Sequence, residues 1–453
     1  MSRRVVITGL GTISAVGRGL DVLWDACLAG RTGIGYIRRF DTSQYKTRIG
    51  AEVDADFDPS DRIDEKLVKR ADPFAKYGVW AADVALEHAH LVIDEGNRHE
   101  VGVLIGSGIG GMTTWEEQFE RLLTRGPGRV SPFLIPMMII DMASGLMSIH
   151  SGAMGPNSAV VTACASGSHA IAASVDLIKA GRAKAVITGG AEAAISQSAL
   201  AGFCSAGALS ERNDDPATAC RPFDRSRDGF VMGDGATGVI VEDLEYALER
   251  GAPILAEIIG IGMSGDAHHI TDPCPDGAGA ALAMDVALRD AGLTPAEIDY
   301  MNAHGPGTPA GDAGEACAIQ QSFGEYAAAV PVSSTKPVHG HMLGATGPTE
   351  LALCIKVMQE GIIPHTLNCT DPEPEGLDIV IGEPRAADVC GWRCRTPSAS
   401  ADTTSRSSSV ALRSEAARRS AAGEPARPVT PGARSSARTH PAARPARSAR
   451  RSG

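Results

Sequence analysis

The sequence predicts an α/β fold built from two halves of similar rhythm. Short apolar runs rich in Val and Ile alternate with longer helical stretches, and glycine or small residues end most of these runs. Strands that are apolar on both faces are typical of a buried sheet covered by helices. The alternation begins again after about Gly251, which indicates a duplicated unit, although no repeat is visible residue by residue.

Each half contributes several expected elements. In the first half we expect strands at residues 5–8, 101–105, 159–162, 185–188 and 238–241, and helices at 75–89 and 167–180. In the second half we expect strands at 254–261, 298–302, 330–333 and 377–381, and helices at 278–291, 312–323 and 349–359. The predicted division is therefore 1–253, 254–388 and a tail at 389–453.

The composition narrows the class of protein. The chain has 453 residues and a formal net charge of −12, which argues against a general nucleic-acid binder. No apolar run is long enough to span a membrane, and the run after Arg4 is too short for a secretory signal. The ten cysteines show no C-x-x-C pair and no zinc spacing, so we expect a soluble protein with free thiols in a reducing cytosol.

The tail differs from the body in both charge and texture. From residue 391 to 453 the chain has 13 Arg and three acidic residues, so this part carries +10 and the remainder −22. It contains one Leu and no Ile, Phe or Tyr. Such a segment buries too little apolar area to offset an ordering cost of roughly 1–2 kcal/mol per residue. We therefore expect residues 389–453 to be disordered.

A cysteine at a strand-to-helix elbow is the sharpest chemical feature. Cys164 follows the apolar run that ends at Thr162 and precedes a helix of small residues. The start of a helix lowers the pKa of a thiol and offers backbone N–H groups to an oxyanion. On position alone, a small buried cysteine at a tight turn explains the pattern equally well.

Two histidine loops in the second half favour the catalytic interpretation. His304 stands in Asn-Ala-His-Gly just past an expected strand, and His341 in Gly-His-x-x-Gly-Ala after another. Loops at strand ends carry the chemistry of α/β proteins. One such histidine is usually a packing residue, but two together with an elbow cysteine form a set of nucleophile and partners.

These motifs resemble those of the β-ketoacyl-(acyl carrier protein) synthases, in particular the elongating type II enzymes. The resemblance runs from Arg4 to about Ala387. It rests on Thr-Ala-Cys-Ala-Ser-Gly at 162–167, Asn-Ala-His-Gly at 302–305, Ser-Ser-Thr-Lys at 333–336, Gly-His-x-x-Gly-Ala at 340–345, Arg-Pro-Phe-Asp at 221–224 and Arg-Asp-Gly-Phe-Val-Met-Gly-Asp-Gly at 227–235. It implies a thiolase-like fold of two related βαβαβ halves in five αβαβα layers, usually a homodimer.

The resemblance also implies the reaction and its residues. Cys164 would accept the acyl chain from acyl carrier protein. His304 and His341 would promote decarboxylation of the malonyl donor and stabilise the enolate that attacks the acyl thioester. No cofactor and no metal is expected, nor any nucleic-acid or membrane partner. The resemblance gives supporting and binding roles to Lys336 and Glu350, which order the site, to Thr308, which holds pantetheine, and to Ile109 and Phe203, which line the acyl pocket.

Some of these assignments have simpler alternatives. An ion pair that merely holds a loop explains Lys336 and Glu350, and core packing explains Ile109 and Phe203. Lys66, Lys69 and Arg70 match a basic patch that docks the acidic carrier protein, but such a cluster is more often a solvated face. Two departures stand out: Pro306-Gly307-Thr308 replaces Thr-Ser-Thr, and Gly207 stands where Arg is common.

A second motif points elsewhere. Residues 106–111 read Gly-x-Gly-x-x-Gly after an expected strand, as in dinucleotide-binding sites. No second strand ending in an acid follows about 20 residues later, as such a site requires. The sequence therefore does not favour a dinucleotide site here.

The family's terminal motif is missing from the residues but present in another reading frame. Relatives end in a strand preceded by Asn-Ser-Phe-Gly-Phe-Gly-Gly, and here residues 393–406 read differently. Back-translation with G+C-rich codons, shifted by one frame, recovers Asn-Ser-Phe-Gly-Phe-Gly-Gly-His-Asn-Val-Ala-Leu-Val-Val. We interpret the tail as frame-shifted from near Val389. The alternative is a true Arg-rich arm that binds nucleic acid or anionic lipid.

This interpretation bears on activity. In the family the lost loop supplies a second oxyanion N–H and a Phe that gates the acyl pocket, and losing one such donor costs about 10²–10³ in rate. A non-catalytic or impaired partner subunit is therefore the alternative function. A degradative thiolase of the same fold would have a second Cys in place of one His, so His in both loops argues against it.

Overall fold

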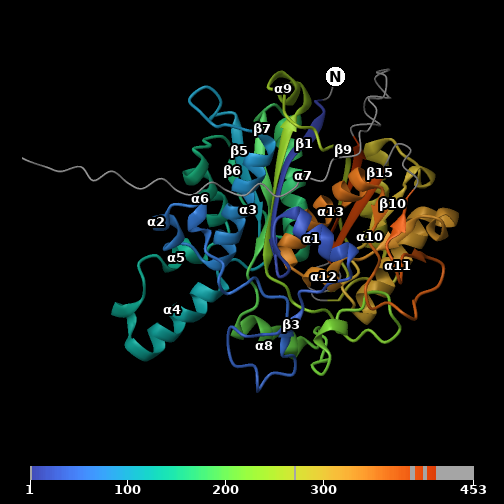
Figure 1. Ribbon diagram of the computed structural model, residues 1–453, viewed down its shortest axis with the longest axis horizontal. Coiled ribbons are helices and arrows are strands. Elements are labelled where there is room, and N and C mark those ends of the chain that lie inside the picture. The colour runs from blue at the N-terminus through green and yellow to red at the C-terminus, as the bar shows by residue number, and fades with distance from the viewer. Residues whose placement is uncertain (1–2, 270–271, 388–392, 401–405, 415–453) are drawn as a thin grey trace, which may run out of the picture.

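Five alternating layers of helix and sheet make up the molecule (Figure 1). The computed structural model describes residues 3–269, 272–387, 393–400 and 406–414. Its main sheet has the strand order β13-β11-β10-β15-β16-β9-β1-β8-β7-β5-β6. The antiparallel pairing of β1 with β9, from Val5↔Ile258 to Ile7↔Ala256, joins the strands of the two halves.

The strands of the first half are β1 (Val5–Ser14), β5 (Val101–Gly106), β6 (Asn157–Ser158), β7 (Ala185–Glu192) and β8 (Gly235–Asp243). Those of the second half are β9 (Ala256–Gly265), β10 (Tyr300–Asn302), β11 (Pro331–Ser333), β13 (Asp378–Ile379), β15 (Arg393–Ser400) and β16 (Arg406–Ser414). Short strands outside this path are β2 (Gly17–Arg18), β3 (Gly35–Tyr36), β4 (Ile49–Gly50), β12 (Ile362–Ile363) and β14 (Arg385–Ala386).

Helices form the three other layers. In one outer layer, α3 (Pro73–Ala89) packs on β1, β7 and β8, with α6 (Met142–Ser151) beside it. Between the two halves of the sheet lie α7 (Ser166–Lys179), on β5 and β7, and α13 (Thr346–Glu360), on β15. On the other outside, α10 (Ala278–Ala291) covers β9 and β16 and contacts α11 (Pro309–Phe323). The middle layer therefore brings the start of α7 and the start of α13 together.

The remaining helices lie at the periphery or in connections. They are α1 (Leu20–Leu28), α2 (Glu65–Val68), α4 (Met112–Arg125), α5 (Leu134–Met138), α8 (Gln197–Ala206), α9 (Leu244–Glu249) and α12 (Lys336–His339). Within the described ranges, no helix is both long and apolar enough to cross a bilayer.

The structure departs from the sequence prediction at residues 159–162. They do not form a strand, and the paired segment is only β6, whose two residues are exposed and pair with Val103 and Leu104 of β5. Val161 is 48% exposed. The expectation of a buried strand at 159–162 is wrong, because this run is half-buried to exposed and follows the edge strand β6.

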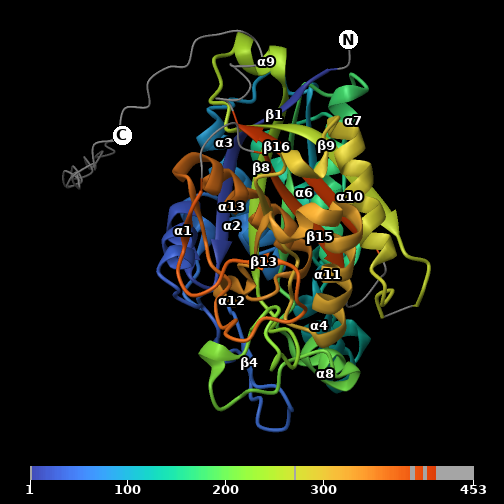
Figure 2. The ribbon, with the colours of Figure 1, turned by 90° about the vertical axis from the view of Figure 1, so that its right-hand side faces the viewer.

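The tail prediction also needs correction. We expected disorder from residue 389, yet β15 and β16 belong to the second-half sheet, as Figure 2 shows. β16 pairs with β9 from Arg406↔Gly265 to Ser414↔Ala256, and Val410 and Leu412 are buried in the core between the sheets. Backbone pairing and this short apolar stretch are enough to place the strand. Residues 401–405, within the segment of the frame interpretation, and 415–453 lie outside the described residues.

Candidate active site

Cys164 lies at the start of the central helix α7, in a tight turn at residues Ala163–Ala165. Ala163 has φ 51°, a left-handed conformation that is strained for any residue with a Cβ. Gly106 allows the turn to approach β5, since a Cβ there would lie 2.4 Å from the Ser166 carbonyl oxygen. The elbow thus presents the buried Cys164 thiol at the positive end of the helix dipole.

His304 is held by its backbone. It follows β10, and its N–H and that of Gly305 each donate to the Glu315 carboxylate at 2.7 Å. The Lys336 ammonium donates to the His304 carbonyl oxygen and to Glu350. Lys336 and Glu350 are fully buried, so this pair holds the His304 loop from inside the protein.

His341 is held by the first half of the chain. Its N–H donates to the Val231 carbonyl oxygen at 2.7 Å, and its own carbonyl accepts from Gly233 at 2.9 Å. The ring stacks edge-on against Phe230 at 5.2 Å. Its Nδ1 accepts the Leu343 N–H at 3.2 Å, which leaves Nε2 to carry the proton and act as a donor.

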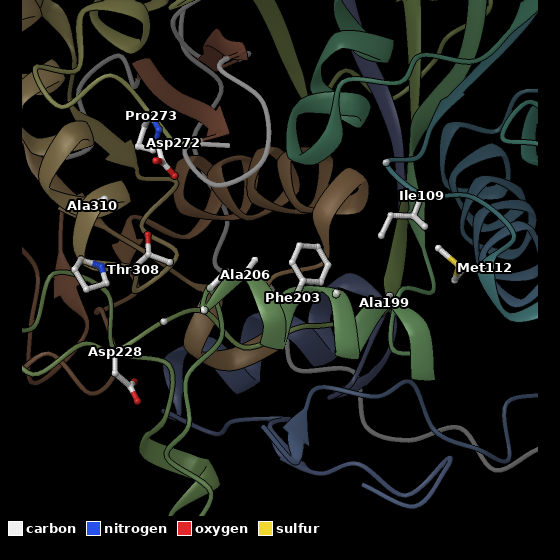
Figure 3. Close-up of a pocket in the computed structure, with 16 residues that line it drawn as sticks. Ile109, Met112, Ala199, Phe203, Ala206, Asp228, Asp272, Pro273, Thr308 and Ala310 are labelled. Atoms are coloured by element: carbon white, nitrogen blue, oxygen red, sulfur yellow. The ribbon is translucent and has the colours of Figure 1, made fainter. Parts of the chain in front are cut away.

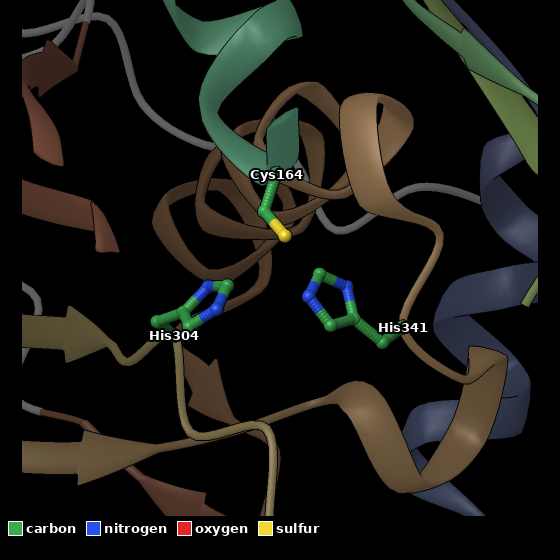
Figure 4. Close-up of side chains that lie close together, drawn as sticks. All are labelled: Cys164, His304 and His341. Carbon is green, nitrogen blue, oxygen red and sulfur yellow. The ribbon is translucent and has the colours of Figure 1, made fainter. Parts of the chain in front are cut away.

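The three predicted side chains converge. One ligand-type atom from each of Cys164, His304 and His341 lies within 4.8 Å of the others, and Figure 4 shows the sulfur pointing between the two rings. The ring centroids are 5.1 Å apart at 81°. Within the described structure, neither nitrogen of His304 nor Nε2 of His341 has a hydrogen-bond partner. These buried nitrogens therefore have hydrogen-bonding capacity that the described protein does not use.

The same geometry bears on the metal question. The sequence analysis expects no metal, but the fold brings Cys164 close enough to the two histidines for one ion to reach all three side chains. Thiolate and imidazole are ligands that soft metals accept. The residue types therefore fit nucleophilic chemistry and, by distance alone, a soft metal ion as well.

Burial sets the charges of the site. It lowers the pKa of both His304 and His341 well below the ordinary value, and the Lys336 charge lowers them further. Both rings are therefore neutral at pH 7. Burial raises the pKa of Glu315 and of Glu350 to about 7, with the Lys336 charge acting against the rise. A neutral imidazole N–H is a suitable donor to a developing oxyanion.

A cavity of about 790 Å³ contains the three predicted substrate residues (Figure 3). In that view Phe203 stands between Thr308 on one side and Ile109 on the other. The Thr308 hydroxyl caps α11 by accepting the Gly311 N–H at 3.1 Å. Gly207 also lines the cavity, where a larger side chain would narrow it.

The predicted docking residues lie on the surface. Lys66, Lys69 and Arg70 are exposed in and after α2. Lys69 pairs with Glu65 at 2.6 Å, and the Arg70 guanidinium stacks over Phe133 at 4.7 Å. These contacts fit a solvated face as well as a docking patch.

The glycine-rich turn at 106–111 holds an internal anion. The N–H groups of Gly108 and Ile109 donate to the Glu192 carboxylate, at 2.7 and 3.2 Å. In a dinucleotide site the N–H groups of such a turn face a phosphate. Here the protein itself fills that place, which agrees with the sequence argument against a dinucleotide.

Sequence reasoning missed three buried carboxylates that hold the loops of the site: Glu192, Asp312 and Glu315. Asp312 accepts the Phe223 and Gly307 N–H groups at 2.6 and 3.0 Å. One signal was available. Asp312 and Glu315 are three residues apart on the helix that follows the His304 loop, so both face that loop.

The amino-acid sequence matches a known protein family over both halves of the chain. Residues 2–247 match the family described as beta-ketoacyl synthase, N-terminal domain, and residues 255–370 match its C-terminal domain. The chain is 51% identical over 385 residues to 3-oxoacyl-[acyl-carrier-protein] synthase 2 of Synechocystis, covering 85% of this chain and 92% of the relative. It is 47% identical over 389 residues to the protein of the same name from Staphylococcus aureus, covering 86% and 94%.

Solved structures agree with the family match. A beta-ketoacyl synthase from Burkholderia phymatum superposes with a TM-score of 0.83 at 34% identity, covering 91% of this chain and 99% of that chain. The ishigamide ketosynthase/chain length factor gives 0.84 at 32%, covering 91% and 100%. A ketosynthase solved with its acyl carrier protein and bound to a hexaketide gives 0.83 at 27%, with the same coverage.

Proposed function

This chain belongs to the β-ketoacyl synthase family, and we propose that Cys164, His304 and His341 are the residues that carry out its condensation. The enzyme is an acyltransferase, a 3-oxoacyl-acyl carrier protein synthase of fatty-acid synthesis. The observation that carries the residue assignment is the convergence of one thiol and two neutral imidazoles from both halves of the chain. Cys164 also packs in one apolar cluster with Ile109 and Phe203, which line the cavity.

In the first step Cys164 takes the acyl chain. Its sulfur attacks the thioester carbonyl of acyl carrier protein, the carbon–sulfur bond to pantetheine breaks, and the pantetheine thiol leaves with the proton of Cys164. The position of Cys164 at the start of α7 stabilises both the thiolate and the tetrahedral oxyanion. Ile109 and Phe203 line the space for the chain, and Thr308 lies where pantetheine would pass.

In the second step the malonyl carboxylate leaves as carbon dioxide. The electron pair of the broken carbon–carbon bond forms an enolate, whose oxygen accepts the Nε2–H of His341 and an N–H of His304. The enolate carbon attacks the acyl thioester, and the tetrahedral intermediate expels the Cys164 sulfur. Neutral rings suit this role, because the donor must hold its proton while charge develops on the substrate.

Two partners belong to this proposal. Acyl carrier protein would dock on Lys66, Lys69 and Arg70, which offer positive charge on an acidic body. A second copy of the chain would cover the edge at β6. Three exposed apolar side chains lie on α6, which contacts β6, or in the chain on either side of β6: Ile149, Met154 and Val161. Further exposed apolar side chains lie on or next to α4 and α5: Trp115, Phe119, Leu123, Phe133 and Ile135.

Mass mapping tests the residue assignment. A limiting thiol alkylator and acyl carrier protein loaded with an acyl group should both modify Cys164 first. Cys204, which is partly exposed, is the internal comparison. His304→Ala should still accept the acyl group on Cys164 but lose condensation. Faster labelling of Cys204, or condensation by Cys164→Ala, would contradict the assignment.

A further inference from the structure

Glu192 is a fully buried carboxylate at the end of β7 that accepts four hydrogen bonds. Oε1 accepts the Ser107 hydroxyl at 2.8 Å and the Ile109 N–H at 3.2 Å. Oε2 accepts the Gly108 N–H at 2.7 Å and the Gly344 N–H at 3.0 Å. Both oxygens therefore face hydrogen-bond donors, as suits an ionised carboxylate.

The donors come from two turns that carry different parts of the site. Residues 107–109 follow β5 in the first half, and Ile109 lines the cavity. Gly344 lies in the turn Leu343–Ala345 in the second half, and the Leu343 N–H of that turn sets the proton position of His341. Glu192 thus stands between the wall of the cavity and the turn that orients a histidine.

The two turns are in backbone contact around this carboxylate. A Cβ at Gly344 would lie 2.8 Å from the Gly108 nitrogen, and a Cβ at Gly190 would lie 2.2 Å from the Gly344 oxygen. Such close approach leaves no room for either turn to relax independently. A change at Glu192 is therefore transmitted to both.

We propose that Glu192 is a positioning residue that ties the Ile109 wall of the acyl cavity to the His341 turn, and so helps set which acyl chains are accepted. The inference rests on the proposed roles of Cys164 and His341. Glu192 touches no substrate in this account and acts only through Ile109 and Leu343–Gly344. The glycine-rich turn then has a use in this protein: it is a cradle for an anion supplied by the protein.

The substitution Glu192→Gln tests the proposal with almost no change of shape. With the amide NH₂ at the Oε2 position it meets the Gly108 and Gly344 N–H groups, and two hydrogen bonds are replaced by repulsive contacts. With the NH₂ at the Oε1 position the Ser107 hydroxyl can turn to accept from it, and only the Ile109 N–H is opposed. The matched control is Glu242→Gln. Glu242 is equally buried, accepts from Thr8 and Arg250, and lies at the opposite end of the β7–β8 pair, where it faces Ala185. Both variants of the full chain are compared with the parent.

The readouts separate positioning from stability. Intact mass measures acylation of Cys164 by acyl carrier protein carrying short, medium or long chains, and condensation is expressed per acylated enzyme. We expect Glu192→Gln to shift the chain-length profile and to lower condensation about 10²-fold, the scale of a misplaced group. Glu242→Gln should lower the thermal midpoint, but its preference among acyl chain lengths should be the same as the parent's.

Equal behaviour of the two variants in profile and condensation overturns the proposal. If Glu192→Gln does not fold, Ser107→Ala removes one donor and keeps the charge, and it should shift the profile in the same direction by less. An unshifted profile in Ser107→Ala then overturns the proposal. A parent protein that does not acylate at Cys164 speaks against the proposed function instead, so the two failures are distinguishable.

Discussion

The turn after β5 in the first half and the turn after β10 in the second use the same device. In each, two consecutive N–H groups donate to one buried carboxylate: Gly108 and Ile109 to Glu192, His304 and Gly305 to Glu315. The difference lies in where each carboxylate reaches next. Glu192 also binds Gly344 of the other half, whereas the His304 turn is supported further by Lys336 from its own half.

The two turns therefore differ in whether their support comes from one half of the chain or from both. The His304 turn is fixed by a network local to the second half, so His304 is held whatever the acyl cavity does. The Ile109 turn is fixed by a carboxylate shared with the His341 turn, so the cavity wall and His341 are coupled. Substitutions in the two networks should therefore change different measured properties.

The largest effect is expected from Lys336→Met. The substitution leaves the Glu350 carboxylate buried without its partner, and breaking a buried pair in this way costs about 3–5 kcal/mol of unfolding free energy. Urea unfolding measures it. Lys69→Met is the control, because the pair of Lys69 with Glu65 is exposed and contributes little. A loss no larger than the control's would show that the second-half network is not a stability element.

A smaller effect is expected from Glu315→Gln. The amide can accept from only one of the two N–H groups, at 2.7 Å each, and an unsatisfied buried donor costs about 1–3 kcal/mol. Because this network holds His304 and not the cavity, condensation should fall while acylation of Cys164 keeps its chain-length profile. The measurement is the same pair of assays as for Glu192→Gln. A shifted profile would mean that the two networks are not separate.

The sequence predicted the parts of this comparison that depend on local pattern. Buried apolar runs indicated β5 and β10, and small or glycine-flanked turns at strand ends indicated Cys164, His304 and His341. Glu192 was missed because its partners are remote: it binds residues 84 and 152 positions away in the chain. No local pattern records such a pairing.

Two further errors have physical causes. Residues 159–162 were expected to be buried strand because they are apolar, but Val161 is exposed at the edge where we propose that a second copy binds. The tail was judged by its average composition, whereas β16 depends on backbone pairing with β9 and on Val410, Ala411 and Leu412. An average over 63 residues hides this short apolar stretch, which is buried.

The smallest effect is expected from the titration of His339, next to Lys336 in the second half, and it concerns the pH dependence of the free energy of unfolding. His339 is buried in α12, with Nδ1 2.7 Å from the Gly340 carbonyl oxygen and Nε2 3.2 Å from the Thr335 hydroxyl. Burial, and then the Lys336 charge, lower the pKa of His339 to about 3. In the unfolded chain an imidazole takes a proton near pH ~6.5. Between these values the unfolded state binds more protons, so stability falls as the pH falls through this window.

His339→Gln removes this titration, so the comparison with the parent isolates it. The free energy of unfolding of the parent, minus that of the variant, should fall by about 1.4 kcal/mol between pH 7.5 and 5.5. Carboxyls with raised pKa, such as Glu315 and Glu350, are present in both chains and cancel. Thr335→Ala loses the same hydrogen bond but keeps the ring, so its difference from the parent should not change with pH. If His339→Gln behaves like Thr335→Ala, the ring is not held neutral by burial, and the contrast between a titrating second-half network and the Glu192 anchor fails at this residue.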